Sequence, residues 1–229
     1  MTPAGRGARH EVGRAVLDSV RNFYAAGLNY RAHIEWANRA QGGNYKVPEQ
    51  ADIGYRSPNA LIASGEDIVI PRDAPGPVHF EGELVAVIGQ RARNLSEAEA
   101  LDCVAGYTLG NDVSERSWQK SDRTLWRAKN ADTFKPMGPA IVGGIDPMDQ
   151  TIEVRINGRT VSSYSTSLML FSVQHYLARM SRYLTLHPGD VVWFGCDGPT
   201  VPALQPGDLV EVVNDAIGVL ANRVVRESS

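Results

Sequence analysis

An uninterrupted run of apolar residues near the middle of the chain predicts a buried strand. The run covers residues 84–88 and ends at Gly89, and short apolar runs of this kind are typical of strands that are buried on both faces. A second apolar stretch covers residues 103–109. Acidic residues adjoin both runs, at 81–83 before the first and at Asp112 after the second.

The second half of the chain alternates apolar and polar residues and predicts several short strands. Residues 152–156 alternate up to an Asn-Gly pair, which predicts a hairpin with a type I′ turn. Two Pro-Gly-Asp turns, at 188–190 and 206–208, each precede an apolar strand, and a last strand is expected near residues 217–225.

Helical periodicity is confined to three segments. Ser172 is expected to cap a helix whose apolar face runs through residues 173–184. Residues 96–101 have the pattern of a capping box that starts a helix. Apolar residues in the segment 12–23 also recur at helix-like spacing, whereas residues 38–55 are polar and aperiodic, which is typical of a mobile surface loop.

Many short strands with few helices predict an α+β fold that is mostly β. The 229 residues suit one catalytic domain, which we expect over residues 27–229. Residues 1–26 are then expected to form a short N-terminal extension.

Composition narrows the class of partner. The net charge is −3 and basic residues form no stripe, so nucleic acid is not expected as a partner. No apolar stretch approaches the roughly 18 residues that cross a bilayer, so no membrane partner is expected. The two cysteines, Cys103 and Cys196, lack the spacing of a metal site and favour a reduced, cytoplasmic protein.

The strongest candidate for chemistry is the pair Glu81 and Glu83, because residues two apart on a strand project to the same face. Two inward-facing carboxylates repel each other and lose hydration unless a cation or bound protons compensate. With Asp112 they offer three oxygen donors, which suit Mg²⁺, Mn²⁺ or Ca²⁺. The spacing alone equally allows a solvated edge for the glutamates and a turn capped by Asp112.

Five motifs follow one another in a fixed order over roughly residues 27 to 225, and together they resemble the fumarylacetoacetate hydrolase family. They are Gly27-Leu28-Asn29-Tyr30-Arg31-Ala32-His33, the Glu81-Gly82-Glu83 pair with Asp112, Asn111-Asp112-Val113-Ser114-Glu115-Arg116, Lys129-Asn130-Ala131-Asp132-Thr133-Phe134-Lys135-Pro136-Met137-Gly138-Pro139, and Ser165-Thr166-Ser167-Leu168-Met169-Leu170-Phe171-Ser172.

The resemblance implies a mixed β-roll with flanking short helices and a site in the mouth of the curled sheet. It implies that Glu81, Glu83 and Asp112 bind Mg²⁺ or Mn²⁺, with Ca²⁺ as an alternative, and that the protein is a homodimer. Three carboxylates fill about three of six octahedral positions. The open positions suit a small 2-oxo or dioxo acid that chelates through two oxygens.

Several cationic and polar side chains are candidates for substrate contacts. The family match favours Lys129 as the active-site lysine, where its charge would stabilise a developing oxyanion, while Lys135 is expected in solvent. Arg116 is a candidate to clamp a carboxylate with two hydrogen bonds, or else forms a structural ion pair. Arg56 and Gln119 are weaker candidates.

His33 is the candidate catalytic base, because histidine activates water near neutral pH when a carboxylate orients its second nitrogen. The resemblance implies a glutamate three residues later, on a lid over the substrate. This chain has Trp36 there and Glu35 one residue earlier, so a catalytic pair of His33 and Glu35 requires a different local geometry. Glu49 is a possible substitute, and a purely structural role for His33 stays open.

A second departure from the family pattern lies near the C-terminus. The resemblance implies a substrate-binding threonine at or near the position of Cys196, and a thiol is a weaker hydrogen-bond donor. Thr200 replaces that threonine only if the loop shifts. His79 is expected behind the metal ligands.

The leading interpretation is a divalent-metal-dependent hydrolase that cleaves a C–C bond in a small dioxo acid of the acylpyruvate or fumarylacetoacetate type. The alternative, at the same metal site, is a decarboxylase or isomerase of an oxo-dicarboxylic acid in aromatic-compound catabolism, which needs no activated water. A third is a homologue that binds a metal or a 2-oxo acid without catalysis, against which the intact acidic residues and Lys129 argue.

Overall fold

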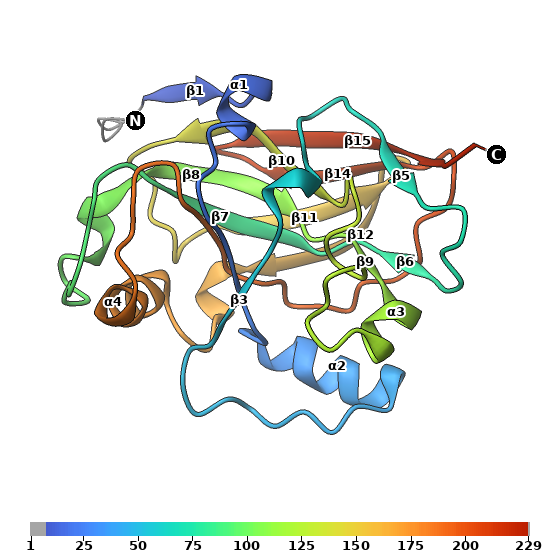
Figure 1. The fold of residues 1–229 in the computed structure, drawn as a ribbon, viewed down its shortest axis with the longest axis horizontal. Coiled ribbons are helices and arrows are strands. Elements are labelled where there is room, and N and C mark those ends of the chain that lie inside the picture. Colours follow the sequence, from blue (N-terminus) through green and yellow to red (C-terminus); the bar gives the residue numbers. More distant parts are fainter. Residues whose placement is uncertain (1–7, 229) are drawn as a thin grey trace.

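The structure is a computed structural model that describes residues 8–228, in which two large β-sheets and the two-stranded sheet β6-β9 are flanked by short helices (Figure 1). The strands are β1 (Arg9–Glu11), β2 (Phe23–Ala26), β3 (Ile53–Tyr55), β4 (Leu61–Ile62), β5 (Ile68–Ile70), β6 (Val78–His79), β7 (Gly82–Ile88), β8 (Val104–Asn111), β9 (Ser114–Glu115), β10 (Lys135–Val142), β11 (Thr151–Ile156), β12 (Arg159–Ser165), β13 (Val191–Trp193), β14 (Leu209–Asn214) and β15 (Gly218–Arg226). The α-helices are α1 (Arg14–Leu17), α2 (Arg31–Gln41), α3 (Arg116–Ser121) and α4 (Val173–Tyr183), and the 3-10 helices are η1 (Pro58–Ala60), η2 (Ala100–Cys103) and η3 (Thr166–Leu168).

The larger sheet has the order β1-β10-β8-β7-β13-β2-β3, with β4 paired beside β10. Its central strands β7 and β8 are antiparallel, and their register places Glu83 opposite Gly110. β13 runs antiparallel to β7 and parallel to β2, so the sheet is mixed. The mostly-β α+β class is therefore confirmed.

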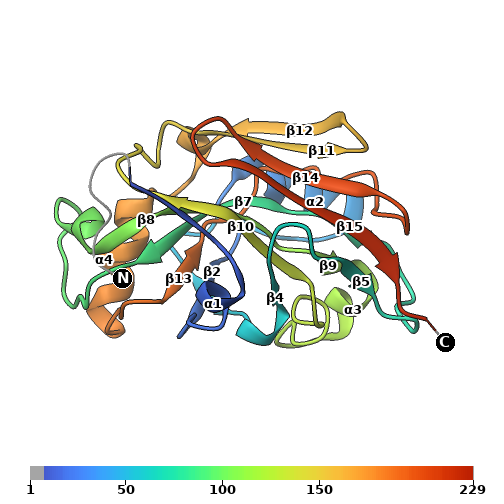
Figure 2. The ribbon, with the colours of Figure 1, turned by 90° about the horizontal axis from the view of Figure 1, so that it is seen from above.

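The smaller sheet has the order β12-β11-β14-β15-β5 and forms a second layer over the first (Figure 2). The expected hairpin joins β11 to β12, and both residues of its Asn157-Gly158 turn have positive φ angles, of 52° and 78°. The two layers approach closely at Gly82, where an added Cβ would lie 2.6 Å from a methyl group of Val154 and 3.1 Å from one of Val212.

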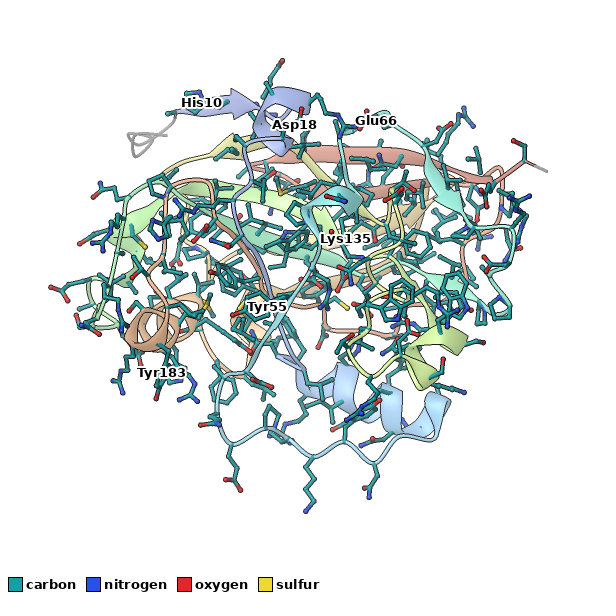
Figure 3. The ribbon with its side chains drawn as sticks, viewed as in Figure 1. His10, Asp18, Tyr55, Glu66, Lys135 and Tyr183 are labelled. Atoms are coloured by element: carbon teal, nitrogen blue, oxygen red, sulfur yellow. The ribbon has the colours of Figure 1, made fainter. Side chains whose placement is uncertain are left out.

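β7 contributes to two hydrophobic cores because both of its faces are covered, as the apolar run predicted. Leu84, Ala86 and Ile88 belong to the larger core, and Val85 and Val87 belong to the smaller core on the opposite face. Side chains from both layers fill the interior (Figure 3). The strand next to the acidic pair is thus held from both sides.

Two helix predictions need correction. The segment 12–23 forms only the single turn of α1, and Phe23 lies in β2, where its ring packs 4.8 Å from that of Trp193. The capping box at Ser96 forms, with its hydroxyl 2.6 Å from Glu99, but only the 3-10 turn η2 follows, because β8 begins at Val104. Tertiary pairing has overridden helical spacing in both places. The helix capped by Ser172 is confirmed as α4.

The N-terminal segment and the expected loop are both partly built into the fold. β1 pairs with β10 and β2 with β13, although both strands fall within the expected extension; the domain boundary at residue 26 stays a prediction, and residues 1–7 lie outside the described residues. α2 continues to Gln41, so residues 38–41 are helical and not loop. Over the part of the chain that the structure describes, no helix has the length and apolar character needed to cross a membrane.

Candidate metal centre and active site

A cavity of about 350 Å³ opens beside the ends of β7 and β8 and is bordered by α2. Its walls come from segments far apart in the sequence. The lining residues are Ala26, Gly27, Leu28, Asn29, His33, Ala37, Tyr45, Arg56, Glu81, Glu83, Asp112, Gln119, Arg123, Leu125, Lys129, Gly195 and Cys196.

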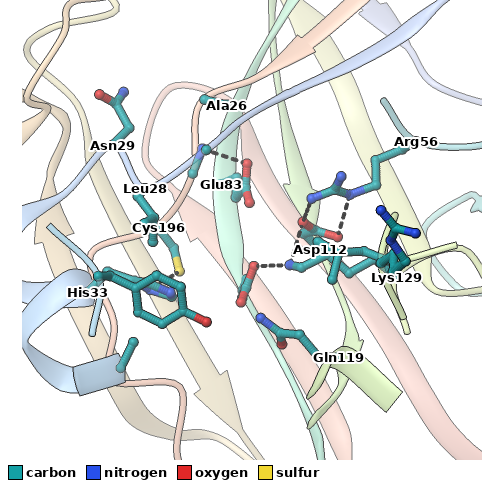
Figure 4. Close-up of a pocket in the computed structure, with 17 residues that line it drawn as sticks. Ala26, Leu28, Asn29, His33, Arg56, Glu83, Asp112, Gln119, Lys129 and Cys196 are labelled. Atoms are coloured by element: carbon teal, nitrogen blue, oxygen red, sulfur yellow. Dashed lines mark hydrogen bonds and ion pairs between the residues drawn. The ribbon is translucent and has the colours of Figure 1, made fainter. Parts of the chain in front are cut away.

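The three predicted acids meet in this cavity (Figure 4). Glu81 immediately precedes β7, Glu83 lies within it, and Asp112 follows β8, so the antiparallel pairing brings them together. One carboxylate oxygen from each lies within 4.8 Å of the others, and all three residues are buried. The backbone braces the arrangement, because the Asp112 amide donates to the Glu81 carbonyl at 2.8 Å.

Lys129 bridges two of the acids. Its Nζ lies 2.7 Å from Glu81 and 2.8 Å from Asp112. Arg56 adds an ion pair of 3.0 Å to Asp112, and Arg116 adds one of 2.7 Å to Glu81. The structure therefore places three predicted cations on the acids themselves.

Lys135, which was expected in solvent, is fully buried. Its Nζ lies 2.7 Å from Asp112 and donates to the carbonyl oxygens of Val113 and Phe134 at 2.9 and 2.8 Å. Three acceptors satisfy the three ammonium N–H bonds, which is why this lysine tolerates burial. Its place at the start of the apolar segment that becomes β10 was the available signal in the sequence.

Burial acts to raise the pKa of each acid, and the neighbouring charges decide the outcome. Lys129 and Arg116 overcome burial and lower the pKa of Glu81 to about 2. Arg56, then Lys129 and Lys135, hold the pKa of Asp112 well below its usual range. At Glu83, burial and the charges of Asp112 and Glu81 raise the pKa to about 8.

The surroundings of the Glu83 carboxyl indicate that the three acids fit a divalent cation. Among residues 8–228, its carboxyl accepts a hydrogen bond only from the Gly195 amide, at 2.7 Å. A buried carboxyl beside two others is ionised only when a positive charge compensates it, and the ammonium of Lys129 already lies between the other two acids. An all-oxygen donor set suits a hard cation.

His33 has no carboxylate partner within the described chain. Its Nδ1 lies 3.4 Å from the Cys196 sulfur, and burial lowers the pKa of its imidazole. Glu35 and Glu49 are exposed and do not line the cavity. Trp36 packs edge-on against His33, with ring centres 5.7 Å apart. The structure thus brings His33 to the site but brings neither glutamate with it.

Arg116 and Thr200 lie behind Glu81 and do not line the cavity. Arg116 donates hydrogen bonds to Thr200 at 3.0 Å and to Gln119 at 2.7 Å. Of these three residues, Gln119 alone lines the cavity. His79 lies 3.2 Å from the Thr200 hydroxyl. Burial, followed by the charge of Arg116, lowers the pKa of His79 to about 4.

Two polar lining residues were missed by the reasoning from sequence. Arg123 follows α3, is exposed, and makes no ion pair with any acid in the described range. Its backbone is fixed because the Asp122 carboxylate accepts hydrogen bonds from the amides of Arg127 and Ala128. Tyr45 lies beyond α2, where Asn38 bonds to its backbone amide and carbonyl. Neither residue belongs to a motif, and only the tertiary fold brings them to the cavity.

Comparisons with known proteins agree on one family. The family model described as fumarylacetoacetate (FAA) hydrolase, C-terminal, matches residues 22–225. The crystal structure of 5-carboxymethyl-2-hydroxymuconate delta-isomerase from Mycobacterium smegmatis has a TM-score of 0.80 at 38% identity, covering 91% of this chain and 80% of that one.

Two curated relatives carry named activities. The chain is 32% identical over 214 residues to oxaloacetate tautomerase YisK of Bacillus subtilis, a match that covers 89% of the chain and 69% of the relative. It is 36% identical over 211 residues to the 4-hydroxyphenylacetate degradation bifunctional isomerase/decarboxylase of Escherichia coli, covering 90% of the chain and 47% of that protein. The chain therefore spans about half the length of the second relative.

The chain belongs to the fumarylacetoacetate hydrolase family, and the expected family assignment is confirmed. Members of this family are enzymes that include isomerases, decarboxylases and hydrolases, and they generally bind a divalent metal. The buried Glu81, Glu83 and Asp112 are the corresponding acidic group of this chain.

Proposed function

We propose that this protein is a metal-dependent tautomerase of a small 2-oxo dicarboxylic acid, with oxaloacetate as the first substrate to test. The observation that carries the proposal is a complete acidic group beside a histidine that no carboxylate of residues 8–228 orients. Keto–enol exchange moves a proton between carbon 3 and the 2-oxo oxygen and consumes no water. Carbon 3 takes up a proton from solvent as the enol oxygen releases one to solvent, so the step needs charge stabilisation but no water-activating pair.

The proposed ion is Mg²⁺ or Mn²⁺, held by Glu81, Glu83 and Asp112. Such an ion supplies Lewis-acid stabilisation of the negative charge that develops on the 2-oxo oxygen. Lys129, already between two of these acids, adds a second positive charge at the same end of the cavity. Arg56 keeps Asp112 oriented through its ion pair and also lines the cavity wall.

The lining charges favour a dianionic substrate. Three cations line the cavity, and Arg116 and Lys135 pair with the same acids from outside the lining. Together with a divalent ion, these five cations exceed the charge of the three carboxylates and favour a ligand with more than one negative charge. Among the cations that line the cavity, Arg123 is the one without an acid partner in the described structure, so we assign it to the distal carboxylate. Gln119 and Tyr45 supply further polar contacts in the same cavity.

Hydrolysis of a dioxo acid, the leading interpretation from sequence, requires a base that activates water. His33 would have to take this role without Glu35 or Glu49, and the polar contact of its ring within the described chain is with Cys196. Decarboxylation of the same dicarboxylates places negative charge on the same oxygen and would use the same acids and Lys129. A homodimer and a cytoplasmic location remain predictions.

The test supplies the purified protein and Mg²⁺ or Mn²⁺ with the enol form of oxaloacetate and, separately, with acetylpyruvate. Loss of the enol absorbance is followed optically and the products are identified by NMR. We expect enol loss to accelerate without release of pyruvate, and Glu83→Gln to abolish the acceleration. Release of pyruvate and acetate from acetylpyruvate, with no effect on oxaloacetate, would replace this proposal with hydrolysis. Release of pyruvate and carbon dioxide from oxaloacetate would replace it with decarboxylation.

A further inference from the structure

The segment 195–198 connects a proposed metal ligand to His33. The Gly195 amide donates to the Glu83 carboxyl at 2.7 Å, and the next residue, Cys196, points its sulfur at His33 Nδ1, 3.4 Å away (Figure 4). Gly198 lies close to the same ring, and a Cβ there would come within 2.9 Å of His33 Nδ1. One short segment therefore determines both the position and the surroundings of the imidazole.

The donor in the contact between Cys196 and His33 follows from what else surrounds the sulfur. The Cys196 side chain is buried, and within the described residues its sulfur has one polar contact, to His33 Nδ1. Burial, and then the charges of Glu81 and Glu83, raise the pKa of the thiol well above its usual value, so the sulfur retains its hydrogen. The ring nitrogen 3.4 Å away is the acceptor within reach of that hydrogen.

The other ring nitrogen faces a different environment. No residue of the described chain forms a hydrogen bond to His33 Nε2, and His33 lines the cavity. A neutral imidazole carries one hydrogen, so a ring that accepts at Nδ1 must carry its hydrogen at Nε2. A carboxylate partner at Nδ1 would select the opposite tautomer, with a free lone pair at Nε2.

We propose that Cys196 is a positioning residue that fixes His33 as the Nε2–H tautomer, so that His33 presents a hydrogen-bond donor and not a base to the substrate. This inference builds on the proposed function, because a donor suits a developing oxyanion and a base is what hydrolysis requires. Cys196 thereby selects proton exchange over hydrolysis in a cavity whose acidic group serves either reaction.

The experiment measures the tautomer directly. Protein labelled with ¹⁵N-histidine and loaded with Mg²⁺ is examined by NMR, and the His33 signals are assigned by their loss in His33→Gln. We expect an unprotonated Nδ1 and a protonated Nε2 in the wild-type protein and in Cys196→Ser, whose hydroxyl also donates. Cys196→Ala should show a mixture of tautomers. Cys103→Ser is the matched control, because that thiol is buried elsewhere and bonds to the Ala100 carbonyl.

Kinetics separates positioning from a merely structural role. Cys196→Ala should lower kcat on oxaloacetate by about 10- to 100-fold while Mn²⁺ affinity and the thermal midpoint stay near wild type. Cys196→Ser should keep kcat within about threefold. Equal losses of kcat in both variants, or losses that follow Mn²⁺ affinity, would overturn the positioning role.

The two proposals fail separately. A hydrogen on Nδ1 in the wild-type spectrum would overturn the tautomer assignment, even if the enol of oxaloacetate is consumed. Absence of turnover with an Nε2–H spectrum would overturn the proposed function and leave the tautomer assignment standing.

Discussion

The two sides of the cavity are built by different means. On the β7 and β8 side, Glu81 and Asp112 are buried and each carries more than one ion pair. On the α2 side, His33 is held by a thiol contact and by packing against Trp36 and Gly198. One side is fixed by interlocking charges, and the other by weak contacts and shape.

The difference assigns separate tasks to the two sides. Glu81, Asp112 and the cations paired with them form a charge cluster. Removing one of its members leaves a buried charge without its partner, so the cluster tolerates little change. A weak contact to His33 is replaced at small cost, and its replacement changes what the imidazole can do. Relatives of this chain are named as an isomerase, an isomerase/decarboxylase and a tautomerase, so the family includes more than one reaction.

The largest expected effect comes from removing one charge of the cluster. Asp112→Asn leaves Arg56, Lys129 and Lys135 without their shared acid and should lower the free energy of unfolding by about 3–5 kcal/mol. Glu83→Gln should change it by less than about 1 kcal/mol, because an amide replaces a carboxyl whose pKa is already raised to about 8. Urea unfolding of the metal-free proteins measures both.

Both variants should lose metal binding, and calorimetric titration of each with Mn²⁺ measures this loss. Equal destabilisation by the two substitutions would contradict the different charge states that we assign to Asp112 and Glu83.

An intermediate effect is expected at Arg123, which lines the cavity but belongs to neither the charge cluster nor α2. Its substitution therefore tests a third part of the cavity. Arg123→Gln should raise the KM for oxaloacetate by about 10- to 100-fold through loss of a charge-assisted hydrogen bond. Inhibition by oxalate should be unchanged, since its two adjacent carboxylates match only the 2-oxo acid end of oxaloacetate and leave no further carboxylate for Arg123. Lys120→Gln, which removes the same charge from an exposed residue outside the cavity lining, is the control. An equal rise in KM in the control would show that the loss of one positive charge on this surface, and not a contact of Arg123 with the substrate, causes the effect.

The smallest expected effect concerns His79, behind the charged side. Its pKa in the folded protein is lowered by burial to about 4 from an ordinary value of 6.5. As the pH falls through 6.5 the unfolded chain binds a proton that the folded chain does not, so stability is complete above pH 6.5 and declines toward pH 4. The drop in Tm between pH 7.5 and pH 5 should be smaller in His79→Gln than in the wild-type protein. An identical drop would assign the acid sensitivity to other groups.

The charged side could be predicted from sequence because its signal is local. Two glutamates two residues apart beside an apolar run define a face, and Asp112 completes the group through a recognisable motif. Lys135 could not be placed in the same way, because its burial depends on an aspartate that arrives from a different strand. Short-range spacing says nothing about that meeting.

The α2 side was harder to predict for a related reason. The sequence shows that Trp36 stands where the family pattern has an acid, but only the fold shows that Cys196 becomes the neighbour of His33. Arg123 reaches the cavity through a loop that Asp122 anchors, and the segment carries no periodic pattern. The helix expected between Val12 and Phe23 failed because strand pairing at β2 outweighs local propensity.

The close approach of the two sheets at Gly82 has an evolutionary consequence. Gly82 separates the two glutamates, and a side chain there would collide with Val154 and Val212 of the other layer. A larger residue at position 82 requires a smaller residue at position 154 or 212, so substitutions at these three positions are expected to occur together in evolution. The spacing of the two proposed metal ligands is thereby coupled to a strand some 70 residues away in the chain, which contributes no residue to the acidic group.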